Sequence, residues 1–455
     1  METKLARIAE VARTKPEERF TSLAHLINKE MLKQCHKEMK TGKASGVDGI
    51  TKIGYEQNLE ENLTDLVNRM RRQAYKPLPA RRTYIPKPGT DEKRPLGIPA
   101  YEDKLVQAGL TKVLNAIYEE IFLDCSFGYR PGRSCHDAIK MLRAIVNKPS
   151  IHYVVDTDLK KFFDSVNHNW MMKFLEHKIE DKNILRLIQR MLKAGIIEAG
   201  IKHDTHEGTP QGGVCSPVLA NIYLHYALDL WFEKAFKKNC EGEAYMVRYA
   251  DDIVFCFEHK REALDFYEAL IERLAKFDLS ISKEKTKIIE LHKDKDDDGD
   301  SEPFDYLGFT FYLDKNPNQF NFKEIRLKTS KKKFQASLLR CKIWIKENRT
   351  LPTREFMKRM KSKIQGHINY YGVTGNYRSV NGFVRKVRAQ LYYWLNRRSQ
   401  KRSFNWEKYE LFLKKYPLPR ATTKVYIYEL GKGSNYLKRT MPRRAVCVSS
   451  ACTVL

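Results

Sequence analysis

The sequence lacks the features that direct a chain into or across a membrane. It has no apolar run long enough to span a bilayer, and no basic start followed by an apolar stretch, so membrane insertion and secretion are both disfavoured. Its nine cysteines are scattered and form no C-x-x-C pair, which argues against a disulfide framework and against a zinc finger. We expect a cytoplasmic protein without membrane contact.

Acidic residues are scarce relative to basic ones. The 455 residues include 83 Lys and Arg against 56 Asp and Glu, a formal net charge of +27. Such an excess indicates a polyanionic partner, with nucleic acid first and an acidic membrane face second. Aromatic residues lie among the basic ones and favour nucleic acid, because aromatic rings stack on bases. The alternative is a basic surface that is merely solvated.

Two adjacent carboxylates organise the rest of the chain. Asp251 and Asp252 lie inside the run MVRYADDIVF, residues 246–255, with apolar residues on both sides. This pattern predicts a β-hairpin of two buried strands with the acids at its turn. Two neighbouring carboxylates are costly to bury without a cation, and Mg²⁺ is the natural candidate because it prefers oxygen ligands. The alternative is an ordinary solvated Asp-Asp turn.

A third carboxylate is available in residues 151–166, which the pattern predicts to be a buried strand running into a turn or short helix. Asp158 follows the apolar run directly, where a strand end can present it at the edge of a site. Asp156 and Asp164 are better interpreted as structural residues. Phe163 follows Asp158 closely enough to contact a nucleotide bound at a metal.

Three glycine- and proline-rich stretches carry basic or polar residues. The prolines spread through 75–99 exclude a helix and predict two extended strands joined at Pro88-Gly89. Lys87 and Arg94 could bind a triphosphate, and the alternative is a loop that merely happens to be basic. The loop 127–134 ends at Ser134, which can cap the next helix; a phosphate site there is the alternative to a structural cap. In the loop 208–217, glycines allow close approach and Gln211 could line a nucleotide pocket.

The later part of the chain supplies further elements. A long helix is expected from about 218 to 236, an amphipathic helix over 263–277, a strand–turn–strand over 279–289 with Lys285 at the turn, and one strand over 304–311. Beyond about residue 320 the composition favours basic helices. One of these carries an apolar stripe at four-residue spacing, which is core by default: Phe356, Met360, Ile364 and Ile368.

Taken in order, these motifs resemble the reverse transcriptases encoded by group II introns, the maturases. The similarity covers nearly the whole chain: GVDG, IPKPGTDEKRPLGIP, FGYRPGRS, the strand bearing Asp158, GTPQGGVCSP, YADD, SKEKTK and FDYLGF. The resemblance implies an α+β right-hand polymerase. Fingers with an N-terminal extension would occupy 1–150, the palm 151–315, a helical thumb or maturase domain 316–400, and a basic segment that is a candidate for DNA binding 401–455.

The same resemblance assigns roles to single residues. It makes Asp158, Asp251 and Asp252 the catalytic and metal-binding aspartates, and Lys285 the lysine that protonates the leaving pyrophosphate. It implies six substrate-binding residues: Lys87 and Arg94 on the triphosphate, Phe163 against a ribose 2′-OH, Gln211 in the nucleotide pocket, and Leu307 and Gly308 on the primer-gripping strand.

The expected reaction is two-metal phosphoryl transfer with two Mg²⁺ ions, copying RNA into DNA. The expected partners are intron RNA as template, a DNA or RNA primer, dNTPs and target DNA, with roles in splicing and retrohoming. No H-N-H nuclease with paired cysteines follows the basic segment, so no second-strand cleavage is expected. Two alternatives stay open: a splicing scaffold with vestigial polymerase activity, and a free-standing bacterial reverse transcriptase used in defence or repair.

Overall fold

A four-stranded antiparallel sheet lies at the centre of the molecule, in the order β6-β7-β3-β8. The computed structural model describes residues 2–86, 93–205, 207–209, 212–293, 299–314, 323–398, 404–430 and 433–438. The strands are β3 (Tyr153–Asp158), β6 (Ala244–Tyr249), β7 (Asp252–Phe257) and β8 (Lys287–Glu290). Because β6 and β7 are apolar along almost their whole length, both faces of the sheet are covered.

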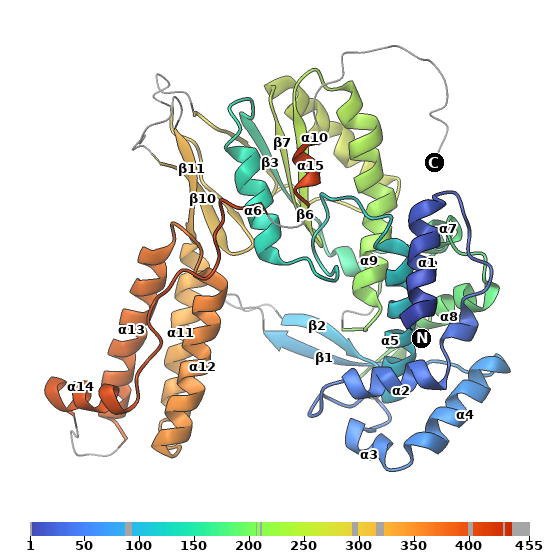
Figure 1. Ribbon diagram of the computed structural model, residues 1–455, viewed down its shortest axis with the longest axis horizontal. Coiled ribbons are helices and arrows are strands. Elements are labelled where there is room, and N and C mark those ends of the chain that lie inside the picture. The colour runs from blue at the N-terminus through green and yellow to red at the C-terminus, as the bar shows by residue number, and fades with distance from the viewer. Residues whose placement is uncertain are drawn as a thin grey trace.

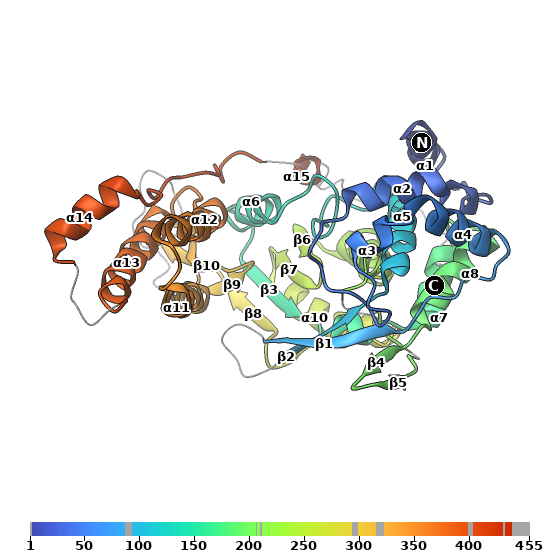
Figure 2. The same cartoon turned by 90° about the horizontal axis from the view of Figure 1, so that it is seen from below.

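Helices on opposite sides of this sheet provide the cover, α6 (Cys135–Val146) on one and α10 (Lys260–Ala275) on the other (Figure 2). The predicted long helix is present, but it begins earlier, as α9 (Ser216–Leu224), and continues through two wider π-helical turns over His225–Asp229 and Phe232–Phe236. The predicted amphipathic helix corresponds to α10.

The N-terminal part of the chain is mostly helical and carries a second sheet, in the order β2-β1-β4-β5. Strands β1 (Ala80–Pro86) and β2 (Lys93–Ile98) form an antiparallel ribbon, which confirms the prediction for 75–99. The other N-terminal elements are α1 (Glu2–Thr14), α2 (Lys29–Glu38), α3 (Lys52–Glu56), α4 (Leu59–Arg71) and α5 (Tyr101–Tyr118). Four elements from later in the chain, after β3, join them: α7 (His168–Glu176), α8 (Lys182–Leu192), β4 (Ile196–Glu198) and β5 (Ile201–His203).

The C-terminal part consists of a three-stranded sheet and a helical region at the far side of the molecule from α1–α5 (Figure 1). The elements are β9 (Phe304–Tyr306), β10 (Phe309–Asp314), β11 (Glu324–Thr329), α11 (Lys331–Asn348), α12 (Thr353–Tyr371), α13 (Tyr377–Leu395), α14 (Trp406–Lys415) and α15 (Asn435–Lys438). The apolar stripe of α12 is fully buried, as the spacing predicted.

Two expectations for this region were wrong. The predicted single strand over 304–311 is a hairpin of β9 and β10, because Leu307 and Gly308 both have positive φ values, 48° and 82°, and reverse the chain. The segment after residue 320 begins with strand β11, which pairs with β10, before the first basic helix. Among the described residues, no helix is long and apolar enough to cross a membrane.

Candidate active site

The three predicted aspartates lie where β3 ends, where β7 begins and in the turn between β6 and β7, and we call this end of the central sheet the acidic edge. Strands β6 and β7 form the expected hairpin, in which Tyr249 pairs with Asp252, so Ala250 and Asp251 form the turn. Strand β3 runs antiparallel to β7 and places Asp158 directly opposite Asp252. Residues far apart in the chain therefore meet at the end of neighbouring strands, as the sequence predicted.

The carboxylates at this edge repel one another. Burial, together with the nearby charges of Asp156, Asp251 and Asp158, raises the pKa of Asp252 to about 7, against a lowering hydrogen bond from the backbone of Leu307. Burial and Asp158 also raise the pKa of Asp251, against the opposing charge of Arg94. A divalent cation would relieve this repulsion, and oxygen donors suit a hard cation such as Mg²⁺.

Lys285, in the turn before β8, forms an ion pair with one of these carboxylates. Its Nζ donates to Oδ2 of Asp158 at 2.6 Å. Within the described residues, no group of three or more His, Cys, Asp or Glu side chains is arranged to hold a metal ion. The Lys285 side chain is 70% exposed, so this ion pair contributes little to stability and can open at small cost. The chemistry of the donors fits a divalent cation once Asp158 exchanges partners.

Asp156 belongs to the same electrostatic cluster, although the sequence favoured a structural role for it. Burial and the charges of Asp158 and Asp305 together raise its pKa to about 7, against the opposing charge of Lys287. Asp156 and Asp158 are two residues apart on one strand, so both project from the same face. The period-2 spacing of these acids was the signal that could have identified it.

A buried ion pair beneath the turn was missed entirely. Arg248 is fully buried, donates through Nε to Oδ1 of Asp229 at 2.8 Å, and donates through Nη1 to the carbonyl of Ala250 at 3.1 Å. The same Nη1 donates to Oδ1 of Asn221 at 2.9 Å. The lone arginine in an apolar strand was the available signal, because a buried guanidinium requires partners.

Gly128 also packs directly against the turn. A Cβ built on it would lie 2.3 Å from the backbone nitrogen of Ala250, so only glycine fits there. Its carbonyl accepts from Nδ2 of Asn221 at 2.7 Å. Ala250 itself has a φ of 60°, which is unusual for a residue with a side chain. The turn is thus held on two sides by buried groups.

The rest of the loop 127–134 is structural. Arg130 and Arg133 form ion pairs with Glu119 and Asp124, and both also donate to backbone carbonyls. Ser134 and Asp137 form a capping box at the start of α6. The predicted cap is confirmed, and the first turn of the helix carries its own carboxylate in place of a phosphate.

Phe163 lies beside the acidic edge, in a short 3₁₀ helix over Phe162–Asp164 that follows β3. Its ring meets Tyr129 edge-on at a centroid distance of 6.4 Å. The loop 207–209 is fixed against it, because the backbone N–H of Thr209 donates to the Phe163 carbonyl at 2.7 Å. Gln211 lies outside the described residues.

Arg94 lies on β2 and its charge reaches Asp251, which places the ribbon near the acids. The ribbon also contacts the glycine loop, since a Cβ on Gly212 would lie 2.7 Å from the carbonyl oxygen of Gly97. Lys87 lies outside the described residues. The ribbon thus lies near both the carboxylates and the glycine loop.

The Leu307–Gly308 turn connects this edge to the helical region. The Leu307 backbone bonds Asp252, and its carbonyl accepts from the hydroxyl of Tyr370 on α12 at 2.8 Å. The structure therefore describes eight of the ten predicted site residues. Four of these lie in direct proximity: Asp158, Asp251, Asp252 and Lys285.

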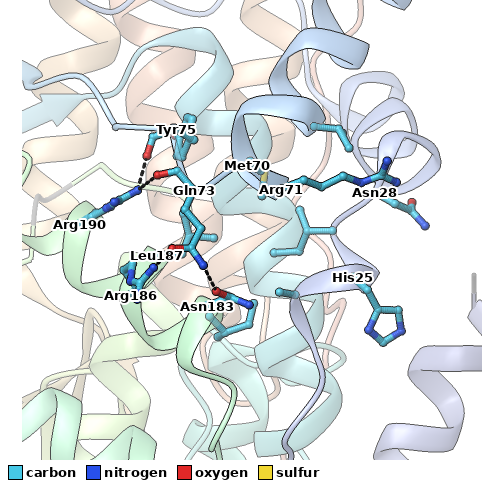
Figure 3. Close-up of a pocket in the computed structure, with 14 residues that line it drawn as sticks. His25, Asn28, Met70, Arg71, Gln73, Tyr75, Asn183, Arg186, Leu187 and Arg190 are labelled. Carbon is cyan, nitrogen blue, oxygen red and sulfur yellow. Dashed lines mark hydrogen bonds between the residues drawn. The ribbon is translucent and has the colours of Figure 1, made fainter.

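A pocket of about 300 Å³ lies elsewhere, between the segment 24–28 that precedes α2, the end of α4 and α8 (Figure 3). Arg190 donates to the carbonyls of Gln73 and Tyr75, both at 2.8 Å. Gln73 in turn donates to Asn183 at 3.0 Å. These bonds fix the segment between α4 and β1 to α8, and the pocket contains none of the predicted site residues.

Comparison with known proteins gives a consistent result. The family described as "Reverse transcriptase (RNA-dependent DNA polymerase)" matches residues 85–311. Protein YkfC of Escherichia coli K12 is 32% identical over 319 residues, covering 62% of this chain and 83% of YkfC. Group II intron-encoded protein LtrA of Lactococcus lactis is 36% identical over 222 residues, 49% of this chain. The chain covers only 37% of the length of LtrA.

A more distant relative is nuclear intron maturase 2, mitochondrial, of Arabidopsis thaliana. It is 28% identical over 196 residues, which cover 32% of this chain and 26% of that protein.

Proposed function

Because this chain belongs to the reverse transcriptase (RNA-dependent DNA polymerase) family, we propose that it synthesises DNA on an RNA template at the carboxylate edge of the central sheet. The observation that carries the proposal is the register of β3 and β7, which sets Asp158 opposite Asp252 beside the turn that holds Asp251. Phosphoryl transfer by a polymerase depends on correctly positioned charge more than on covalent catalysis by the protein, and the three carboxylates concentrate negative charge at one place.

In this proposal the molecule is a right hand. The ribbon β1–β2 and the N-terminal helices are the fingers, within 1–150; the central sheet is the palm, within 151–315; and α11–α13 form the thumb, within 316–400. The segment 401–455 is a further basic region that would contact DNA. The spatial order supports this assignment, since the central sheet lies between the two helical parts (Figure 1).

Asp158, Asp251 and Asp252 would hold two Mg²⁺ ions, which when bound lower the pKa of a primer 3′-OH and neutralise the leaving pyrophosphate. Arg94 and Lys87 bind the triphosphate oxygens, where a guanidinium can bond two oxygens at once. Phe163 lies against the sugar of the incoming nucleotide and disfavours a 2′-OH, and Gln211 lines the same pocket. Leu307 and Gly308 position the primer end.

Lys285 serves as the proton donor to the leaving pyrophosphate. Its bond to Asp158 keeps the ammonium at the acidic edge, and its exposure leaves it free to swing toward a bound triphosphate. The carboxylate that it releases then becomes available as a metal ligand.

We further propose that the template is a group II intron RNA, that the primer is DNA or RNA, and that the protein binds this RNA to assist splicing and retrohoming into target DNA. The similarity to an intron-encoded protein and to an intron maturase supports this role, as does the net charge of +27. The DNA flanking the reading frame distinguishes this role from that of a free-standing reverse transcriptase, because only an intron-encoded protein lies within a folded intron.

Primer extension on poly(rA)/oligo(dT) tests the polymerase. Asp251→Asn should reduce extension by at least about 100-fold, since it removes a charge needed in the transition state, while RNA binding persists. Asp265→Asn, on the exposed face of α10, is the matched control and should extend as wild type does. Full extension by Asp251→Asn, or its loss together with RNA binding, would contradict the assignment.

A further inference from the structure

The chain that leaves the helical region turns back toward the central sheet. After α14 it passes α6, and α15 lies on the far side of α6 from α11–α13 (Figure 2). We call residues 422–430 and 433–438 the strap. Its contacts fall on three separate parts of the molecule.

The first attachment of the strap is to the end of α12. The backbone N–H groups of Lys424 and Val425 both donate to the carbonyl of Gly372, at 2.5 and 3.1 Å. The N–H of Thr374 donates to the carbonyl of Val425 at 3.0 Å. A Cβ on Gly372 would lie 2.6 Å from the carbonyl oxygen of Thr422, so this close backbone contact requires glycine. The strap therefore begins as a fixed part of the helical region.

The second attachment is to α6, which covers the central sheet. The guanidinium of Arg143 on α6 lies over the Tyr428 ring at 4.1 Å. Arg143 also forms an ion pair with Glu324 on β11, which holds its side chain in place. Ile427, next to Tyr428 in the strap, is only 4% exposed. The strap thus packs on α6 as it passes.

The third attachment is a buried tyrosine beside the central sheet. Tyr436 is 6% exposed; its hydroxyl accepts from the backbone N–H of Met246 on β6 at 2.9 Å and donates to Glu233. Its ring meets Tyr245 edge-on at a centroid distance of 5.9 Å, and the ammonium of Lys237 lies over it at 4.8 Å. Because the buried hydroxyl has both a donor and an acceptor partner, this is a specific docking site.

The entry to this docking site is fitted as closely. Gly433 has a φ of 94°, and a Cβ there would lie 3.2 Å from both the carbonyl oxygen of Asp124 and the Phe127 ring. Both conditions favour glycine. Phe127 directly precedes Gly128, which packs against the turn that holds Asp251. The strap therefore ends against the loop that supports the acidic edge.

These attachments limit how far the helical region can move from the central sheet. Val425 is fixed to the helical region, and Gly433 and Tyr436 are fixed beside β6. A fully extended chain spans at most about 3.6 Å per residue, so the eight steps from residue 425 to 433 reach about 29 Å. Any wider opening requires the third attachment to break.

We propose that the strap is a tether that holds the helical region close to the acidic edge, so that a template–primer duplex stays enclosed between successive nucleotide additions. The proposal rests on the polymerase function above and adds to it a control on how long the enzyme stays on its template. A tether keeps the helical region at a high effective concentration around the duplex. Without it the helical region moves away more often, and the duplex dissociates sooner.

Lengthening the strap in the full chain tests the tether without removing any contact. A linker of about ten Gly and Ser residues, inserted between the exposed Glu429 and Leu430, adds slack between the second and third attachments. The same linker inserted after Gly200 is the matched control. Gly200 lies in the exposed turn between β4 and β5, where nothing lies within 4 Å of the position its Cβ would take.

Primer extension on poly(rA)/oligo(dT) with heparin as a trap limits each enzyme to one binding event. The variant with the lengthened strap should give products shorter by about threefold or more, because the duplex is released sooner. Its single-turnover rate for the first addition should change by less than about twofold, because the aspartates are untouched. The Gly200 variant should match wild type in both measurements. Products of wild-type length from the lengthened strap would overturn the proposal.

Two further measurements separate the tether from the polymerase function. Tyr436→Phe removes the hydroxyl that bonds Met246 and Glu233 but keeps the ring, and it should also shorten the products. Energy transfer between dyes at Leu339 on α11 and Arg261 on α10, both exposed, reports the separation of the helical region from the central sheet. Lengthening the strap should make these distances longer and more broadly distributed.

The distance measurement needs no catalysis, so the two proposals can fail separately. A wild type that does not extend primers would contradict the polymerase function, and a distance change in the same preparation would still support the tether. An unchanged distance distribution in the variant with the lengthened strap would overturn the tether, whatever the polymerase activity.

Discussion

Asp252 is the residue at which fold stability and proposed function conflict most directly. Its folded pKa, about 7, lies above the ordinary value of 3.8, so between these values the folded protein binds a proton that the unfolded chain releases. Its stabilising contribution is complete below about pH 4 and is lost as the pH rises through 7. Above pH 7 the ionised carboxylate destabilises the metal-free protein.

Asp252→Asn should therefore be more stable than wild type in EDTA at pH 8, and the difference should shrink toward pH 5. One proton sets a ceiling of about 1.4 kcal/mol per pH unit on this effect. Thermal unfolding at pH 5, 6, 7 and 8 measures it, with Asp265→Asn as the exposed control. A stability difference that stays constant over this range would show that the Asp252 carboxylate does not titrate there.

At the scale of the element, the β6–β7 hairpin depends on the ion pair beneath it. Arg248 and Asp229 are both fully buried, and Arg248 also bonds the carbonyl of Ala250 within the turn. Removing one member of such a pair leaves an uncompensated buried charge, whereas removing both members does not.

Arg248→Met should cost roughly 3–5 kcal/mol of unfolding free energy, and Arg248→Met combined with Asp229→Leu should recover most of it. Primer extension should stay depressed in the double variant, because the bond from the guanidinium to Ala250 is still missing. Chemical denaturation followed by circular dichroism measures the stability, and single-turnover extension measures the activity. Full activity in the stable double variant would show that Arg248 serves stability alone.

Elements with a local signal could be predicted from the sequence. The apolar runs on both sides of the paired acids predicted the hairpin, and the prolines of 75–99 predicted the ribbon. The reversal at Leu307 gave no such signal, because its positive φ occurs at a non-glycine residue inside an apolar run. Strand β11 was hidden by its charged residues Glu324, Arg326 and Lys328, and its place is set by pairing with β10. The partner of Arg248 is likewise a tertiary contact, invisible to local pattern.

At the scale of the whole molecule, the net charge of +27 and the many lysines and arginines of α11–α13 both indicate contact with a polyanion. Each phosphate that the protein neutralises releases counterions, so the affinity for a template–primer duplex should fall steeply and linearly on a plot of log affinity against log salt. The slope counts phosphate contacts, and one lost contact reduces its magnitude by roughly 1.

Arg340 is an exposed cation on α11, and we expect it to contact a phosphate, so the slope for Arg340→Gln should be smaller in magnitude than the wild-type slope by about 1. Asp251→Asn should keep the wild-type slope because it removes no cation. Anisotropy titrations from about 50 to 300 mM KCl provide both slopes. Arg261→Gln, which removes an equal charge from the exposed start of α10 rather than from α11–α13, controls for a change in net charge alone. A wild-type slope near zero would mean that the basic excess does not contact phosphates, and the helical region would then have no role in holding the duplex.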